Sequence, residues 1–556
     1  ILSPEMGFFL SLFGKRQSSV RSATYVLMVM VLASRVFGLV RDRLLAARFS
    51  PDELGVYLAA FRLPNLLFEL LVMGALTSAF IPVYTKLLHE NKEKEAWAMS
   101  SAVINLCIGA LVIVSIPMLI WTEQMSQLIT PGFSEADIIT MSSYTRFIIA
   151  SQVIPLLVGN FFTGILQSYD IFLIPAAAPV IYNLGTIFGI IVLTPIYGLW
   201  APVIGVGIGA ALFMFIQIPS LIKIGFKYQL IWSAKVEGVK DVFRLMGPRT
   251  FGLAVSQIDS TTDLILASIL GPRMVTIFNF AQHLQQLPIG LFGSTVAQAA
   301  FPILSRAAAK KDHGLFEETI VSTMNQILFY TLPVSVLFIV LRTPIVRLVF
   351  GASQFDWDAT VLTGMTLSAF SVSLFAQSAI QILTRAFYAL YDSRTPVGVS
   401  ITTIIVNITL SLFFIQYMGW SVWSLGVSTS IANILHVLIL VALLYRKQQG
   451  MDIFRLVHNP VRMVVASLVM SVVVYIPFKL FDQLVFDTTR TLGLILLLGA
   501  VSGIGLLTYL YLVWLFDVTE VKSVLALLER VKNLRSFFIE PANEVVDNGN
   551  QDQPVS

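Results

Sequence analysis

The stretch "SRVFGLVRDRLLAARF", residues 34–49, places four arginines and an aspartate inside a segment that is otherwise apolar enough to span a membrane. A charge at the centre of a bilayer costs between about 2.5 and about 17 kcal/mol, depending on how well it reaches water. Charges in such a position therefore need a water-filled cavity, a partner or a ligand. The charged residues are Arg35, Arg41, Asp42, Arg43 and Arg48.

The composition of the whole chain is that of a polytopic membrane protein. Of its 556 residues, 56% are hydrophobic and only 12% are charged, whereas about a quarter of the residues in a soluble protein are charged. Segments long enough to cross about 30 Å of hydrocarbon recur from end to end. We therefore expect an all-α protein with about 14 transmembrane helices and without a cleaved signal peptide.

Polar residues, glycines and prolines mark the breaks between the candidate spans. A polar stretch also follows the last span, so we expect the cytoplasmic tail 517–556 to be partly disordered. The predicted spans are 24–49, 54–88, 97–121, 138–168, 172–196, 199–225, 243–270, 274–308, 315–341, 359–390, 395–417, 420–445, 460–481 and 490–516.

The distribution of Lys and Arg among the loops predicts the orientation of the chain, because cytoplasmic loops carry an excess of both. The loop after the third span, "TEQMSQLITPGFSEAD", contains neither residue and is expected to face outward. Both termini are then cytoplasmic, in agreement with an even number of spans. The basic residues on the cytoplasmic side include Lys15, Arg16, Lys92, Lys94, Lys235, Lys310, Lys311, Arg446 and Arg455.

Two pairs of similar segments suggest that the chain contains an internal repeat. Residues 63–88 resemble 287–308 and align Pro82 with Pro302, whereas 164–184 resemble 385–405 and align Asp170 with Asp392. The separations of 220 and 222 residues fit one register, and an even number of intervening spans gives both copies the same orientation. The repeat predicts two lobes with a substrate site between them. The alternative is a chance likeness of apolar helices that contain Pro and Gly.

The spacing of the charges in 34–49 assigns them to different helix faces, since successive residues turn by about 100°. Arg41 and Arg48 share one face, and Arg35 and Asp42 share another, where they can compensate each other. Arg43 and Arg48 lie near the outer end and can extend to the interface. Arg35 and Arg41 lie deeper, and their guanidinium groups suit a phosphate ligand. A purely structural ion pair is the alternative for these two.

The seventh span carries two carboxylates, Asp259 and Asp263, which are four residues apart and therefore share a face. Among the neighbouring hydroxyls they can coordinate Na⁺ or exchange protons. The alternative is a structural pair satisfied by Arg249 or Arg273, and Asp263 is the better ion candidate because it lies further from both. In the next span, His283 is either a hydrogen-bonded core residue or a titratable charge facing a cavity.

Motifs for ATP hydrolysis and for hydrolytic catalysis are missing from the sequence. There is no GxxxxGK[ST] loop, no HExxH, no cysteine cluster and no GxSxG elbow, and each of these motifs supplies a specific catalytic chemistry. We therefore expect a carrier rather than an enzyme, with no cofactor apart from a coupling ion, Na⁺ or H⁺.

The combination of "SRVFGLVRDRLLAARF", "FRLPNLL" and "GALTSAFIPVY" resembles the start of the MurJ/MviN family, and the resemblance continues through "MGPRTFGLAVSQI", "FPILSR" and "RAFYALYDSRTP". These are lipid II flippases of the multidrug/oligosaccharidyl-lipid/polysaccharide exporter superfamily. The resemblance implies two lobes, formed by helices 1–6 and 7–12, around a central cationic cavity. Helices 13 and 14 would form a lipid-tail groove. The implied substrate is an undecaprenyl-pyrophosphate-linked disaccharide-pentapeptide, moved to the outer leaflet by alternating access.

The resemblance also implies roles for individual residues. The family's cavity charges on the first helix fall on Arg35, Arg41 and Asp42, which would receive a pyrophosphate. The acid that the family offers to sodium falls on Asp263, and the acid that closes helix 10 falls on Asp392.

Other positions depart from the family pattern. Two family arginines are replaced, and Arg62 and His283 are the residues expected to compensate. The departures are Phe68 and His283 in place of arginines, Gln286 and Gly55 in place of acids, and Tyr388 in place of an asparagine.

The predicted division of the chain follows from these spans and from the resemblance. It comprises an N-terminal segment 1–23, an N-lobe 24–225, a cytoplasmic linker 226–242, a C-lobe 243–445, the lipid-tail groove 446–516 and the tail 517–556. We expect a bacterial cytoplasmic (inner) membrane protein whose partners are lipid II, membrane lipids and cell-wall synthesis proteins, and no nucleic acid. The alternatives are an exporter of another polyprenyl-pyrophosphate glycan or amphipathic compound, and a transport-inactive scaffold.

Overall fold

The computed structural model describes residues 20–70, 79–448, 452–488 and 490–521. Within these ranges the chain is helical and contains no β-strand. Ten helices are long and apolar enough to cross a membrane, or up to eleven if the bent pair Trp357–Ser371 and Leu374–Ala389 is one span. The prediction of an all-α polytopic membrane protein is confirmed, whereas the count of fourteen stays a prediction. Most of the predicted tail lies outside the described residues.

The helices of the first half follow the predicted spans to within a few residues, except at the breaks described below. They are α2 (Val20–Arg48), α3 (Pro51–Ala60), α4 (Arg62–Phe68), α5 (Ile81–His89), α6 (Glu93–Ile120), α7 (Thr122–Ile129), α8 (Glu135–Ile148), α9 (Ile154–Ser168), α10 (Leu173–Phe188), α11 (Thr194–Tyr197), α12 (Trp200–Phe215) and α13 (Ile218–Lys223), with π-helical turns η3 (Ile149–Val153) and η4 (Gly189–Leu193).

The second half begins with a long helix and ends with two that have no counterpart in the first half. Its elements are α14 (Val239–Ile269), α15 (Pro272–Pro288), η5 (Ile289–Ser294), α16 (Thr295–Ala309), α17 (His313–Val340), α18 (Arg342–Phe350), α19 (Trp357–Ser371), α20 (Leu374–Ala389), α21 (Arg394–Leu412), η6 (Phe413–Tyr417), α22 (Trp423–Lys447), α23 (Ile453–Leu484) and α24 (Thr491–Leu515).

The second predicted span is divided at Phe61, between α3 and α4. Pro64 has no N–H with which to bond the carbonyl of Ala60, so the helix ladder is interrupted there. Thr145 Oγ1 of α8 donates a 3.0 Å hydrogen bond to that carbonyl. The break is therefore compensated by a neighbouring helix, as buried backbone groups within a membrane require.

The backbone repeats itself with the offset that the sequence predicts. Helices α6 and α17 both contain 28 residues, and they begin 220 residues apart. Residues with a positive φ angle follow corresponding helices in the two halves. Asn91 after α5 corresponds to Lys311 after α16, and Asp170 after α9 corresponds to Tyr391 after α20. The alignment of Asp170 with Asp392 was therefore wrong by one residue, because the left-handed turn after α20 falls on Tyr391.

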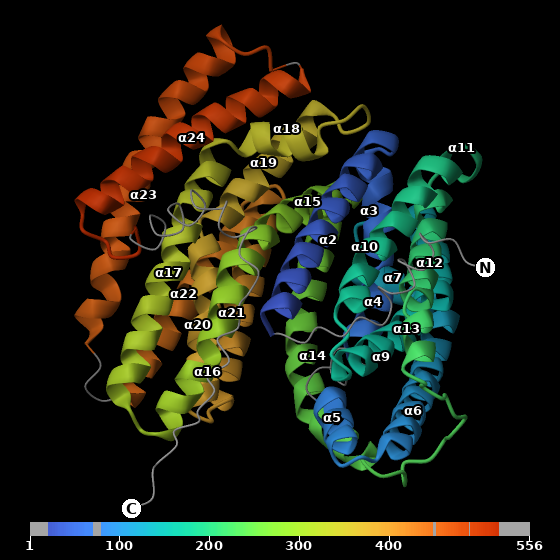
Figure 1. The fold of residues 1–556 in the computed structure, drawn as a ribbon. Helices are drawn as coiled ribbons and strands as arrows, with labels where there is room; N and C mark the ends of the chain where they lie inside the picture. Colours follow the sequence, from blue (N-terminus) through green and yellow to red (C-terminus); the bar gives the residue numbers. More distant parts are fainter. Residues whose placement is uncertain (1–19, 71–78, 449–451, 489, 522–556) are drawn as a thin grey trace, which may run out of the picture.

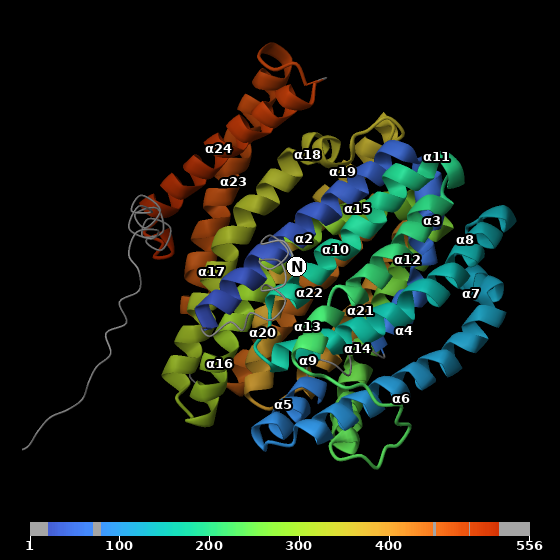
Figure 2. The ribbon, with the colours of Figure 1, turned by 45° about the vertical axis from the view of Figure 1, so that its right-hand side comes forward.

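The two halves lie beside each other, and α23 and α24 pack on the far side of the second half (Figure 1). The turned view keeps α23 and α24 against α17 and α18 (Figure 2). Contacts between the halves run through α2 with α18, α3 with α15, and α14 with α6 and α7. The charged helices α2 and α14 thus lie at the junction of the two halves.

Candidate functional site

The aspartate of the opening stretch joins the two halves of the protein. Asp42 Oδ1 accepts from Nε and Nη2 of Arg41 at 2.9 and 2.8 Å, and Asp42 Oδ2 lies 3.1 Å from Nδ1 of His283 on α15. The aspartate is only 4% exposed. The remaining partner of Arg41 is Asn183 on α10, whose Oδ1 accepts from Nη1 at 3.1 Å. The buried carboxylate and the arginine paired with it therefore connect three helices, α2, α10 and α15.

The prediction that Arg35 compensates Asp42 is wrong, since the aspartate pairs with Arg41. Seven residues of helix rise by about 10.5 Å, so an ion pair between Arg35 and Asp42 requires both side chains to extend along the axis. The guanidinium of Arg41 reaches the neighbouring carboxylate directly. Arg35 is exposed, and no described side chain forms an ion pair with it.

The two outer arginines of the stretch behave differently from each other. Arg48 is exposed, as expected for a side chain that extends to the interface. Arg43 instead donates from Nη1 to the carbonyl of Leu348 on α18, so it is fixed between helices.

Arg62, predicted to compensate for a lost arginine, ties α4 to α14. Its Nε and Nη2 donate to Thr261 Oγ1 at 2.9 and 2.6 Å. Nη2 also donates to the carbonyl and to Oε1 of Gln257, at 2.6 and 2.9 Å. The guanidinium is thus held by neutral acceptors.

The carboxylates of α14 lie together and are buried with incomplete hydrogen bonding. One oxygen each of Asp259 and Asp263 has no hydrogen-bond partner in the described part of the chain. Asn407, on α21, lies near both carboxyls, and its Oδ1 accepts from Thr429 Oγ1 at 3.4 Å. Two carboxylates and an amide therefore lie near one another where α14 meets α21, and such oxygen-bearing groups suit a cation or a shared proton.

The alternative of a structural pair with Arg273 is wrong, because that arginine is engaged elsewhere. Arg273 Nη2 bonds Asp356 Oδ2 at 2.6 Å, and Nη1 lies 3.7 Å from Asp52 Oδ2. Through this interaction Arg273 holds the pKa of Asp356 below its usual value. The side chain of Arg249 lies outside the described residues.

The structure does not bring Asp392, the third predicted ion-coupling residue, close to Asp259 and Asp263. Its Oδ2 bonds Lys447 Nζ at 2.5 Å and Thr395 Oγ1 at 2.7 Å. The Lys447 ammonium and Thr395 hold the pKa of this carboxyl well below its ordinary value. Asp392 is therefore a permanently ionised partner of Lys447 at the end of α20.

Two asparagines of the site were not predicted from the sequence. Asn183 and Asn407 are the only amide side chains of α10 and α21; Asn183 bonds Arg41 on α2, and Asn407 lies near Asp263 on α14. An isolated amide within a predicted span is the signal that could have identified them, because such groups rarely stay without a partner in hydrocarbon. Asn407 supplies an amide near Asp263, whereas Tyr388, at the position where the family has asparagine, is 44% exposed.

An all-helical bundle of apolar spans, with an internal repeat and charges buried between its halves, defines a polytopic membrane transporter. The sequence model of the family "Lipid II flippase MurJ" matches residues 52–493. The chain belongs to this family.

Curated relatives agree along most of the chain. The probable lipid II flippase MurJ of Vibrio cholerae serotype O1 is 28% identical over 516 residues, covering 89% of this chain and 95% of that protein. Lipid II flippase MurJ of Burkholderia cenocepacia is 25% identical over 418 residues, covering 73% of this chain and 80% of that protein.

Solved structures show the same fold. The structure described as "Lipid II flippase MurJ, inward closed conformation" superposes with a TM-score of 0.73 at 26% identity, covering 88% of this chain and 98% of that chain. An inward-facing multidrug resistance MATE transporter of the MOP superfamily shares the fold, with a TM-score of 0.64 at 14% identity and coverage of 75% and 95%.

Proposed function

We propose that this protein moves lipid II from the cytoplasmic to the outer leaflet of the bacterial cytoplasmic membrane, by alternating access between its two halves. Membership of the MurJ family supports the substrate class. Contacts that join the halves through a few side chains support the mechanism, since such contacts can be exchanged between two states.

The observation that carries the proposal is the cluster of Arg41, Asp42 and His283, in which Asp42 is buried and the other two side chains are partly exposed. A guanidinium has five N–H donors, of which three serve Asp42 and Asn183. The two others remain for a diphosphate, which suits a planar guanidinium. A diphosphate bound to Arg41 lies next to Asp42, whose contact with His283 links α2 to α15, so binding can change this link. The decisive experiment is to deplete the protein and measure which leaflet holds lipid II.

Transport of another polyprenyl-diphosphate glycan is the second candidate, favoured by the reduced positive charge of the site. Phe68 carries no charge, and Arg62 is held by α14. His283 interacts with Asp42 instead of supplying a free cation. Normal lipid II flipping after depletion, with accumulation of a different lipid-linked glycan inside, would support this candidate. Loss of neither activity would indicate a scaffold that recruits cell-wall synthesis proteins.

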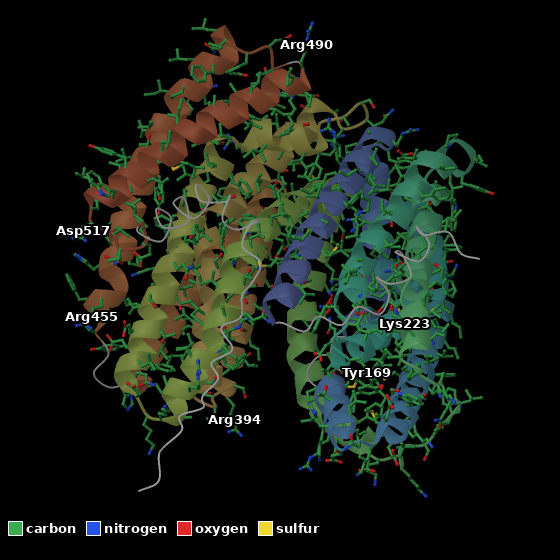
Figure 3. The ribbon with its side chains drawn as sticks, viewed as in Figure 1. Tyr169, Lys223, Arg394, Arg455, Arg490 and Asp517 are labelled. Carbon is green, nitrogen blue, oxygen red and sulfur yellow. The ribbon has the colours of Figure 1, made fainter. Side chains whose placement is uncertain are left out.

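The loop charges favour one end of the bundle as the outer end, and a contact between the two halves at that end supports a state closed to the outside. Arg394 and Arg455, in predicted cytoplasmic loops, lie at the end opposite to Arg490 (Figure 3). At the same end as Arg490, Thr276 Oγ1 of α15 donates to the carbonyl of Pro51 at 2.6 Å. The structure then represents a state closed to the outside.

Gly55 allows this closure, because a Cβ at that position would lie 1.9 Å from the carbonyl oxygen of Pro272. We expect Gly55→Ala to separate α3 from α15 and to depopulate the closed state about tenfold or more, which corresponds to about 1.4 kcal/mol. Spin labels at Glu135 and Asp358, which are both exposed, measure the separation. Gly38→Ala is the matched control, since no atom lies within 4 Å of its Cβ. An unchanged distance distribution in Gly55→Ala contradicts the assignment.

Cysteine labelling tests the proposed orientation. The single native cysteine, Cys107, is only 2% exposed, so its background labelling is low. We expect Ala136→Cys, at the start of α8, to react with an impermeant thiol reagent added to intact cells. Lys94→Cys, at the start of α6, should react only after lysis; both positions are exposed. The opposite pattern would invert the topology.

We also propose that Asp259, Asp263 and Asn407 hold the coupling ion, Na⁺ or H⁺. The proposal rests on two buried carboxyl oxygens without partners in the described chain. The nearness of Asn407 on α21 to Asp263 on α14 also supports it. An ion bound there would change how these two helices pack.

A further inference from the structure

A cavity lies where α24 begins, on the side of α2 that carries Arg43, and two residues of helix turn this side by about 200° from Arg41. It has a volume of about 260 Å³ and is formed between α2, α18, α19 and the first turn of α24. The helices α18 and α24 lie against each other in both views (Figures 1 and 2). Its polar and aromatic lining consists of Arg43, Arg347, Trp357, Thr360, Thr488 and Thr491.

Two arginines face this cavity without a carboxylate partner. Arg43 donates to the carbonyl of Leu348, and Arg347 lies over the ring of Trp357 with its Cζ 5.9 Å from the centroid. Within the described ranges neither forms an ion pair. Asp356 and Asp358 line a separate cavity together with Arg273, and Asp487, next to Thr488 in the chain, pairs with Arg490. The cavity therefore has two positive charges that the protein does not neutralise.

The start of α24 adds hydrogen-bond donors to the same cavity. This helix is 25 residues long, and no side chain caps its N-terminus. Its first-turn N–H groups and the positive end of its dipole therefore favour an anion. The hydroxyls of Thr360, Thr488 and Thr491 can donate as well. Guanidinium groups, hydroxyls and a helix N-terminus together suit a phosphate group.

The surroundings of the cavity indicate that this phosphate belongs to a lipid. Leu492, Ile495 and Leu496 are 68%, 48% and 50% exposed on the first turns of α24. An acyl or prenyl chain can lie along these residues while its headgroup enters the cavity. We infer that the cavity binds the phosphate headgroup of a lipid at this surface of the membrane. The inference does not depend on which molecule the central site transports.

Two lipids share the required chemistry, namely a resident phospholipid and the transported lipid diphosphate. The experiment uses full-length protein purified in detergent and titrated with phosphatidylglycerol or with undecaprenyl diphosphate, with native mass spectrometry as the readout. We expect Arg347→Gln to weaken binding of the preferred lipid at least tenfold. Arg342→Gln is the matched control on α18, because Arg342 lies outside the cavity and bonds only Ser368 among the described residues, at 3.4 Å.

Each outcome decides the inference. A preference for phosphatidylglycerol that Arg347→Gln abolishes identifies a resident phospholipid, whereas the same loss for undecaprenyl diphosphate identifies the transported lipid at this site. Arg43 is not substituted, because it also holds α18. If Arg347→Gln lowers the thermal midpoint, the second variant is Thr491→Val, which replaces a hydroxyl of the cavity with a methyl group. Wild-type affinity of the folded variants for both lipids would overturn the inference.

Discussion

Arg41→Ala is expected to abolish flipping while the protein still inserts in the membrane. The substitution removes the donors that remain for a diphosphate and also releases Asp42, which Arg41 holds at 2.8 Å. A hydrogen bond to a charged group contributes about 1.5–3 kcal/mol, so the loss of two substrate contacts lowers transport by about a hundredfold or more. The measurement is the fraction of lipid II in the outer leaflet of cells that depend on the variant.

Controls separate substrate binding from folding, because removing one partner of a buried ion pair destabilises a protein by about 3–5 kcal/mol. The double variant Arg41→Ala/Asp42→Ala removes both charges and should insert normally without flipping. Arg41→Lys should restore only part of the activity, since an ammonium lacks the planar fork. Arg48→Ala, on the same helix but exposed, should flip normally. Full activity of Arg41→Ala would exclude Arg41 from the substrate site.

Hydropathy was enough to predict the helices, because each span must satisfy its backbone internally and expose apolar side chains to lipid. The offset of the repeat was also predictable, and α6 and α17 show it in their equal lengths. The break at Phe61 was missed. A proline within a span is compatible with either a kink or a break. The hydrogen bond from Thr145 to the carbonyl of Ala60, which compensates the break, depends on how the helices pack.

The charged residues of the site were predictable, whereas their partners were not. Charges within apolar segments are conspicuous, so Arg41, Asp42 and Asp263 were identified from the sequence alone. Asn183 lies 142 residues from Arg41 along the chain, and no helical period relates the two. Which polar residues meet is decided by the packing of non-adjacent helices. The sequence therefore predicts the charges that need partners more reliably than it predicts which partners they find.

The comparison of Asp263 with Asp392 tests the proposed coupling site directly. The family pattern offers both acids, but the structure gives them different environments. Asp392 is ionised and paired with Lys447, so it is not suited to carry a proton or to release a cation. Asp263 is 7% exposed and has an oxygen without a partner among the described residues. An uncompensated carboxylate in that position is unfavourable, so we expect it to bind a proton or a cation.

We therefore expect Asp263→Asn to remove the dependence of flipping on an ion gradient, while lipid binding stays nearly intact. An amide keeps the size of the side chain but neither titrates nor supplies an anionic ligand. The measurement is lipid II flipping in proteoliposomes with imposed Na⁺ or proton gradients. Asp392→Asn is the matched control and should retain gradient dependence, although it loses the ion pair with Lys447.

The same variant should change the balance between the two states of the transporter. An ion can drive that balance only if it binds one state more tightly than the other. Because Asn407 joins the pair from α21, ion binding should favour the state in which α14 and α21 are packed as they are here. Distances between labels on the two halves should therefore respond to Na⁺ or pH in the wild type and not in Asp263→Asn. If Asp263→Asn keeps its gradient dependence and Asp392→Asn loses it, the coupling site lies at the end of α20 and the pair on α14 is structural.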